Sequence, residues 1–191
     1  MIDDFDLSFS DFQAWADWRA SHRGSLSEQQ ISAVAASIGV DGFVEPLTEW
    51  EARPGSIVVG KSFREGLKFQ GINARARAVM FCIAKALDRR PASGVRIYAA
   101  EGLTSFAGRM RGFFPRFLGS EYGRTPEEVS RLYPIPSEDL SRLSLPDATF
   151  DITSTNEVLE HVPDLDACLR ELVRVTRPGG WYIGTIPFAF S

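Results

Sequence analysis

The sequence predicts an α/β three-layer sandwich with a mostly parallel sheet, joined to a helical amino-terminal appendage. Three observations predict it. After Gly94, short apolar runs alternate with stretches of helical spacing, and the connections between them are short. A hydrophobic share of 44% over 191 residues is enough for a substantial core. The first ~60 residues do not share the alternation, so we expect an appendage over residues 1–62 and the main domain over residues 63–191.

The appendage shows two helical patterns and an irregular stretch. Phe12, Trp15 and Trp18 recur at helical spacing. Ser27 precedes a second apolar stripe, which Gly39 ends. Residues 42–66 are rich in proline and glycine, so we expect irregular chain with one short strand over residues 56–59. The two tryptophans either pack against the main domain or form a lid over a substrate pocket.

The main domain begins with a clear amphipathic helix over residues 73–87. Strands and helices then alternate, as buried apolar runs and periodic stretches indicate. A possible capping box at Thr125 and Glu128 starts a short helix. The expected strands cover residues 95–100, 117–120, 150–155 and 181–186, with a weak strand before 138. The expected helices cover residues 103–114 and 165–173, the latter stopping at Pro178-Gly179-Gly180.

Charge and targeting signals exclude several classes of protein. The net charge of −4, from 21 basic and 25 acidic residues, disfavours bulk nucleic-acid binding. The start is acidic where a signal peptide would be basic, and no apolar run approaches the ~20 residues of a membrane span. We expect a soluble cytoplasmic protein. Cys82 and Cys168 fall on apolar helix faces, so we expect both in the core of a protein from a reducing compartment.

Polar residues follow the expected strands where a parallel α/β sheet binds its ligands. Glu101-Gly102 follows the first strand, Glu121 the second, and Asn156-Glu157 the fourth. Glu138 and Asp139 lie near the end of the weak third strand. A carboxylate about 20 residues past the first turn is placed to accept from ribose hydroxyls. The first turn, AAEGLTSFAG, has one well-placed glycine, which argues against a dinucleotide reductase.

The stretch from Glu138 to Phe188 resembles a known family segment by segment. Its parts are EDL, LPDATFD, LEHVPD, RELVRVTRPGG and the final strand into IPF. In this order and spacing they resemble class I S-adenosylmethionine-dependent methyltransferases, which have a Rossmann-like fold. Upstream, REGLKFQGINARARA and FPRFLGSEYG resemble a subgroup that often carries a zinc-binding cysteine pair before the first helix. Here that segment, LKFQGIN, has no cysteine, so we expect no metal.

The resemblance covers Phe63 to Phe188 and implies S-adenosylmethionine as the cofactor. By position, Glu101 and Gly102 would border its methionine end and Glu121 would hold the ribose. Asp139 would meet the adenine amino group, Leu140 would lie against the ring, and Asn156 and Glu157 would line the floor beneath the sulfonium. His161 is the candidate general base, since imidazole titrates near neutral pH. The alternative is that His161 caps the next helix or satisfies a loop carbonyl.

The implied function is methyl transfer to a small molecule or glycan. A non-catalytic, truncated interaction module is the alternative, and another nucleotide-dependent Rossmann enzyme is disfavoured by the missing glycine fingerprint. The chain stops at Ser191, just after the fifth-strand pattern, where complete class I folds continue with a helix and a hairpin. We therefore expect an uncovered edge strand, with self-association or poor solubility.

Overall fold

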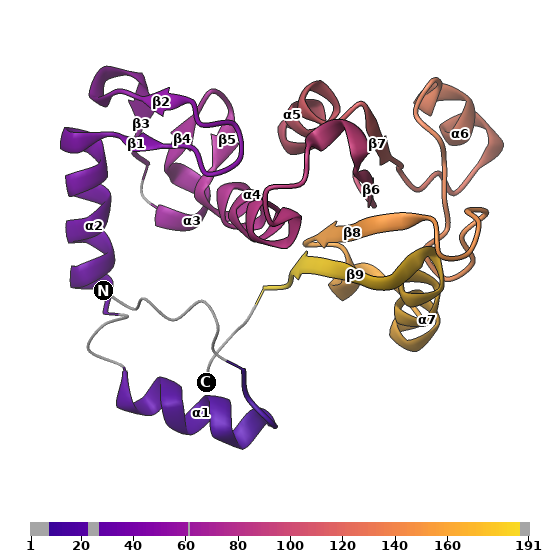
Figure 1. Cartoon of the computed structure of the whole chain (residues 1–191), viewed down its shortest axis with the longest axis horizontal. Coiled ribbons are helices and arrows are strands. Elements are labelled where there is room, and N and C mark those ends of the chain that lie inside the picture. Colours follow the sequence, from indigo (N-terminus) through magenta and orange to yellow (C-terminus); the bar gives the residue numbers. More distant parts are fainter. Residues whose placement is uncertain (1–7, 23–26, 61, 188–191) are drawn as a thin grey trace.

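The computed structural model describes residues 8–22, 27–60 and 62–187. Its main sheet has the order β7-β6-β8-β9, and every neighbouring pair is parallel (Figure 1). The strands are β6 (Arg96–Ala99), β7 (Arg116–Gly119), β8 (Phe150–Asn156) and β9 (Thr176–Thr185). The α/β fold with a parallel sheet is thus confirmed.

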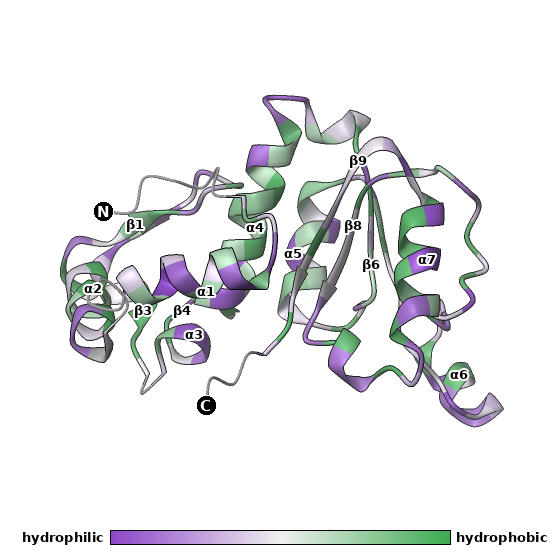
Figure 2. Ribbon diagram, turned by 90° about the horizontal axis from the view of Figure 1, so that it is seen from below, coloured by the Kyte–Doolittle hydropathy of each residue, from purple (hydrophilic) through white to green (hydrophobic). Residues whose placement is uncertain are grey.

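Helices cover both faces of this sheet. The helices α4 (Ala74–Leu87) and α5 (Ser105–Phe113) lie on one face and α7 (Leu165–Val175) on the other (Figure 2). Ile97 and Ile152 pack toward α4 and α5, whereas Tyr98 and Phe150 pack toward α7. All four side chains are at most 5% exposed. Each such side chain contributes about 1.5–3 kcal/mol on burial, so the two apolar clusters hold the three layers together.

Local capping and periodicity explain the first of these helices. Asn73 accepts a hydrogen bond from the Ala76 backbone N–H at 2.8 Å and so caps the start of α4. Val79, Met80 and Ile83 follow at helical spacing and are at most 2% exposed. The helix therefore presents one apolar stripe to the sheet, as its sequence pattern predicts.

Three details of the main domain differ from the sequence predictions. The last strand starts at Thr176, so Pro178-Gly179-Gly180 lies inside β9, beside a register shift opposite Phe150 and Ile152. Proline is tolerated at such an edge, where its missing N–H costs no ladder bond. The weak third strand is a single parallel bridge between Glu121 and Ser137. Cys82 is exposed, so its predicted place in the core was wrong, whereas Cys168 is buried as predicted.

The amino-terminal part contains more strand than its sequence suggested. Two helices, α1 (Phe12–Ser21) and α2 (Glu28–Asp41), precede two small antiparallel sheets. The first sheet pairs β1 (Phe43–Val44) with β2 (Glu51–Ala52), and the second has the order β3-β4-β5, formed by β3 (Ile57–Val58), β4 (Lys68–Phe69) and β5 (Ile72–Asn73). The short helix α3 (Phe63–Gly66) joins β3 to β4. Residues 42–66 are thus less irregular than expected, and the expected boundary at 62/63 falls between two paired strands.

The aromatic residues of α1 make ring contacts close by in the sequence. Trp18 lies against Phe9 and stacks on His22, with ring centroids 5.6 Å and 4.6 Å apart. No residue of α1 is classed as buried. The choice between a packing role and a lid role for these tryptophans therefore stays a prediction. Within the described ranges, no helix is long and apolar enough to cross a membrane.

Candidate cofactor site

Two cavities flank the carboxyl end of β6. A cavity of about 390 Å³ is lined by Ala100, and one of about 170 Å³ by the next residue, Glu101. The larger cavity also contains the predicted site residues Glu121, Asp139, Leu140 and His161, and the smaller one contains Asn156. Gly102 and Glu157 are not among the residues that line either cavity. The structure thus brings six of the eight predicted residues to two neighbouring hollows.

Glu121 fastens the turn that follows β6. Its Oε1 atom accepts hydrogen bonds from the backbone N–H groups of Gly102 and Leu103, at 2.8 and 2.9 Å. These bonds leave the second carboxylate oxygen, Oε2, outside the contact with the turn. A carboxylate with one oxygen fixed to the backbone is pre-organised to offer the other to a ligand donor.

The single glycine of this turn has a steric reason. A Cβ atom on Gly102 would lie 2.5 Å from Cγ2 of Ile135 and 3.2 Å from the carbonyl oxygen of Gly119. A Cβ on Gly119 would in turn lie 2.5 Å from the carbonyl oxygen of Glu101. The ends of β6 and β7 therefore approach so closely that only glycine fits at either position.

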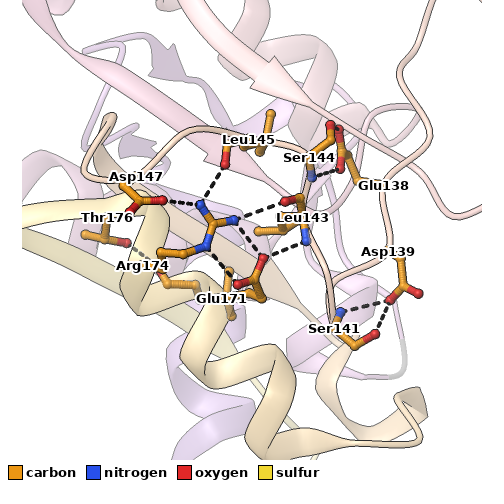
Figure 3. Close-up of polar contacts among 11 residues, drawn as sticks. Glu138, Asp139, Ser141, Leu143, Ser144, Leu145, Asp147, Glu171, Arg174 and Thr176 are labelled. Carbon is orange, nitrogen blue, oxygen red and sulfur yellow. Dashed lines mark hydrogen bonds and ion pairs between the residues drawn. The ribbon is translucent and has the colours of Figure 1, made fainter.

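The loop of residues 138–147 forms another wall of the larger cavity and is tied to itself (Figure 3). Asp139 accepts hydrogen bonds from the side chain and the backbone N–H of Ser141, at 2.7 and 2.8 Å. These two bonds hold the pKa of Asp139 below its usual value, so the carboxylate stays ionised. Glu138 makes the corresponding pair of bonds to the side chain and N–H of Ser144.

An ion pair on α7 clamps the same loop (Figure 3). Arg174 donates to the carbonyl oxygens of Leu143 and Leu145, at 3.0 and 2.8 Å, and to Asp147 at 2.6 Å. It also binds Glu171 at 2.7 Å, and Glu171 accepts from the N–H of Leu143 at the same distance. Because five hydrogen bonds share one guanidinium, the position of the loop relative to α7 is fixed.

Apolar side chains form part of the wall of the larger cavity. Leu140, Val158, Val162 and Cys168 line it, and they belong to the apolar cluster between the sheet and α7 or pack against it. Polar residues also line it, among them Ser120 and Glu121. An apolar cavity with a few fixed polar groups is typical of sites for small organic ligands.

The smaller cavity is polar and carries opposite charges. Glu101 is 8% exposed and accepts hydrogen bonds from Thr104 Oγ1, at 2.6 Å, and from Asn156 Nδ2. Burial raises the pKa of Glu101, although these hydrogen bonds and the nearby Arg75 act in the opposite direction. The Oδ1 atom of Asn156 is buried without a hydrogen-bond partner. A buried amide oxygen without a donor is costly, so the geometry fits a ligand that supplies one.

Glu157 and His161 lie further from these polar contacts. Glu157 has φ +56°, and its Oε2 binds Arg64 of α3 at 3.0 Å, while its Oε1 is buried without a partner. His161 lines the larger cavity with a 77% exposed side chain, 3.8 Å from Glu160. The cap of α7 is Asp164, which accepts from the Ala167 N–H, so the expectation that His161 caps this helix was wrong.

Sequence reasoning missed residues that reach the smaller cavity from outside the strand ends. Gly71, Ile72 and Asn73 of the β4–β5 hairpin line it, as does Arg75 at the start of α4. Arg75 lies off the apolar stripe of its helix, so the helical pattern gave no reason to place it at the site. Its place two residues after the Asn73 cap was the available signal, since helical side chains tilt toward the N-terminus of their helix.

Parts of the chain are similar to known methyltransferases. Residues 121–184 match a family model described as "Methyltransferase domain". The demethylmenaquinone methyltransferase of Streptomyces avermitilis is 35% identical over 101 residues, which is 51% of this chain and 44% of that protein. The 2-methyl-6-phytyl-1,4-hydroquinone methyltransferase of Synechocystis is 38% identical over 56 residues, 29% of this chain and 17% of that protein. The chain thus spans less than half the length of these curated relatives.

One solved structure matches part of the chain. The S-adenosylmethionine dependent methyltransferase from Mesorhizobium loti matches at 21% identity, over 56% of this chain and 52% of that chain, with a TM-score of 0.41. The family match rests on residues 121–184, which include β8, α7 and nearly all of β9. Over residues 121–184 the chain is therefore similar to methyltransferases.

Proposed function

We propose that this chain binds S-adenosylmethionine across the two cavities and transfers its methyl group to a small-molecule or glycan acceptor. The smaller cavity carries the proposal. It combines a buried carboxylate, Glu101, with the guanidinium of Arg75 and the unpaired Oδ1 of Asn156. An α-amino acid needs such a pairing, because its ammonium group requires acceptors and its carboxylate requires a cation.

The larger cavity suits the nucleoside end. The Oε2 oxygen of Glu121 can accept hydrogen bonds from the ribose hydroxyls, while its Oε1 oxygen accepts from the turn after β6. Leu140 and Val158 offer apolar surface to a purine ring, and Asp139 offers an ionised acceptor to an exocyclic amino group. These roles follow the family resemblance and use groups that the fold has already fixed in place.

The bound cofactor would supply an electrophilic methyl group on a sulfonium. The sulfur of that sulfonium is already a good leaving group and needs little assistance. The contribution of the protein is then chiefly orientation and exclusion of water. A protic acceptor also needs a proton acceptor, and His161 remains our candidate for the general base. Its exposed ring on the wall of the larger cavity leaves it accessible to an acceptor that approaches from solvent.

Methyl transfer can be tested directly. Purified protein would be incubated with methyl-labelled S-adenosylmethionine and a panel of phenols, quinols, amines and sugars, and products would be read by mass spectrometry. The proposal predicts a labelled product that disappears in Glu101→Gln, which neutralises the carboxylate in the smaller cavity. Tight cofactor binding without any labelled product across the panel would favour the non-catalytic interaction module instead.

We also propose that two copies of the chain associate through β9. This strand ends the sheet order, so one of its edges lacks a neighbouring strand in the described part of the chain. Trp181 is 54% exposed and Ile186, just after the strand, is 46% exposed. An apolar stretch at the edge of a sheet is prone to pair with its own copy, and residues 181–186 contain no charged residue.

A further inference from the structure

One wall of the smaller cavity comes from a hairpin that is far from the sheet in sequence. Gly71, Ile72 and Asn73 line that cavity, and they belong to the β4–β5 hairpin or its turn. The turn residues Gln70 and Gly71 have φ +48° and +80°, as a two-residue hairpin turn requires. A Cβ on Gly71 would lie 3.4 Å from Ser105 Oγ, so the turn rests against the start of α5.

Arg109 of α5 ties this turn to the amino-terminal part. Its guanidinium donates to Gln70 Oε1 and to Glu45 Oε2, each at 3.1 Å. The same guanidinium lies over the ring of Trp50, 4.4 Å from the ring centroid. One side chain thus joins three segments: the loop after β1, the hairpin turn and α5.

Burial stabilises the ion pair between Glu45 and Arg109. Glu45 is 0% exposed, and Arg109 is 11% exposed. A buried carboxylate without its cation is costly, so the pair holds Arg109 in one place, and the hydrogen bond from Thr48 to Glu45 adds to this. Stacking on Trp50 restricts the plane of the guanidinium further. The donor that reaches Gln70 is therefore fixed by residues outside the hairpin.

A second arginine supports the base of the same hairpin. Arg77 of α4 is 7% exposed and donates to the carbonyl oxygens of Ile72, at 2.6 Å, and Leu67, at 2.9 Å. It also lies over Phe43, 4.7 Å from the ring centroid. The base of the hairpin is thus secured by the core of the domain, whereas its tip depends on Arg109.

We propose that Glu45, Arg109 and Gln70 are positioning residues for the methionine end of the cofactor. They touch no cofactor atom in this account. Through the turn they set the wall formed by Gly71, Ile72 and Asn73, so the amino-terminal part contributes to cofactor affinity. The inference rests on the proposed function, because it assigns the smaller cavity to the amino-acid end.

Two ligands separate this role from a general structural one. S-adenosylhomocysteine has both ends, whereas 5′-methylthioadenosine lacks the amino acid, and both would be titrated by calorimetry. Gln70→Ala removes one exposed hydrogen bond, so we expect S-adenosylhomocysteine to bind roughly three- to ten-fold more weakly. We expect the affinity for 5′-methylthioadenosine to be unchanged. Gln70→Glu, which keeps an acceptor for Arg109, should restore wild-type affinity.

Matched variants sharpen the comparison. Lys68→Ala removes another exposed side chain of the same hairpin and should alter neither affinity. Arg109→Lys keeps a cation for Glu45, but a single ammonium cannot reproduce the fork that reaches both partners, so it should show the same split as Gln70→Ala. Equal losses for both ligands, or no loss for either, would overturn the inference. Wild-type protein that binds neither ligand would instead overturn the proposed function and this inference with it.

Discussion

Replacing Glu121 by glutamine isolates its proposed contact with the cofactor. The amide oxygen of glutamine can still accept from the N–H groups of Gly102 and Leu103, which the structure places 2.8 and 2.9 Å from Oε1. The other carboxylate oxygen becomes an NH₂ group, which cannot accept from a ribose hydroxyl. A hydrogen bond to a charged group contributes about 1.5–3 kcal/mol, so S-adenosylhomocysteine should bind about 10- to 150-fold more weakly.

Alanine at the same position should add a second effect. It removes the acceptor of both turn N–H groups, of which that of Gly102 is partly buried, so the free energy of unfolding should fall by about 1–3 kcal/mol. Glu127→Gln, the same change on the exposed surface of α6 (Pro126–Leu132), is the matched control and should leave the affinity for S-adenosylhomocysteine unchanged. Calorimetry would give the affinities and urea denaturation the stabilities. Wild-type affinity in Glu121→Gln would refute the ribose assignment.

Three further predictions follow from the fold. In Gly102→Ala, the new methyl group would lie 2.5 Å from Ile135, so urea denaturation should show a loss of about 1–3 kcal/mol, and wild-type stability would contradict the steric argument. Burial raises the pKa of Asp151, but hydrogen bonds from Arg96 N–H and Arg90, with Arg177 nearby, outweigh burial and hold it below its usual value. At a pH above the pKa that Asp151 has in the unfolded chain, the stability from these contacts is fully present. It is lost as the pH falls through the lower pKa that Asp151 has in the folded protein. Asp151→Asn should therefore flatten the decline in stability below about pH 4 in acid titrations, and an unaltered decline would argue against it. Trp181→Lys should reduce any dimer seen by light scattering to a monomer, whereas equal masses for both proteins would count against pairing through β9.

The strand ends of the candidate site could be predicted because they follow from a general rule. Parallel strands end at one edge, so Glu101 and Asn156, 55 positions apart, were expected to meet, and a hydrogen bond joins them. The short stretches over residues 95–100, 117–120 and 150–155 predicted β6, β7 and β8 to within one residue at each end. These patterns involve residues that are neighbours in the sequence, so they can be recognised from a single sequence.

The wall of the smaller cavity that the β4–β5 hairpin forms could not be predicted in this way. The strands β1 to β5 have two residues each, too few to show an alternating pattern. The Glu45–Arg109 pair joins residues 64 positions apart, and no spacing rule connects them. Such long-range ion pairs depend on how separate segments pack, so the contribution of the amino-terminal part became visible only in three dimensions.

Binding of S-adenosylhomocysteine to the purified wild-type chain tests the central claim most directly. The fold contains both cavities, and hydrogen bonds hold the loop of residues 138–147 and the turn after β6 in place. Isothermal titration calorimetry should therefore show saturable binding of one ligand per chain. The heat-capacity change should be negative, because binding buries the apolar lining of the larger cavity. Absence of saturable binding at millimolar ligand would contradict the assignment of these two cavities to the cofactor.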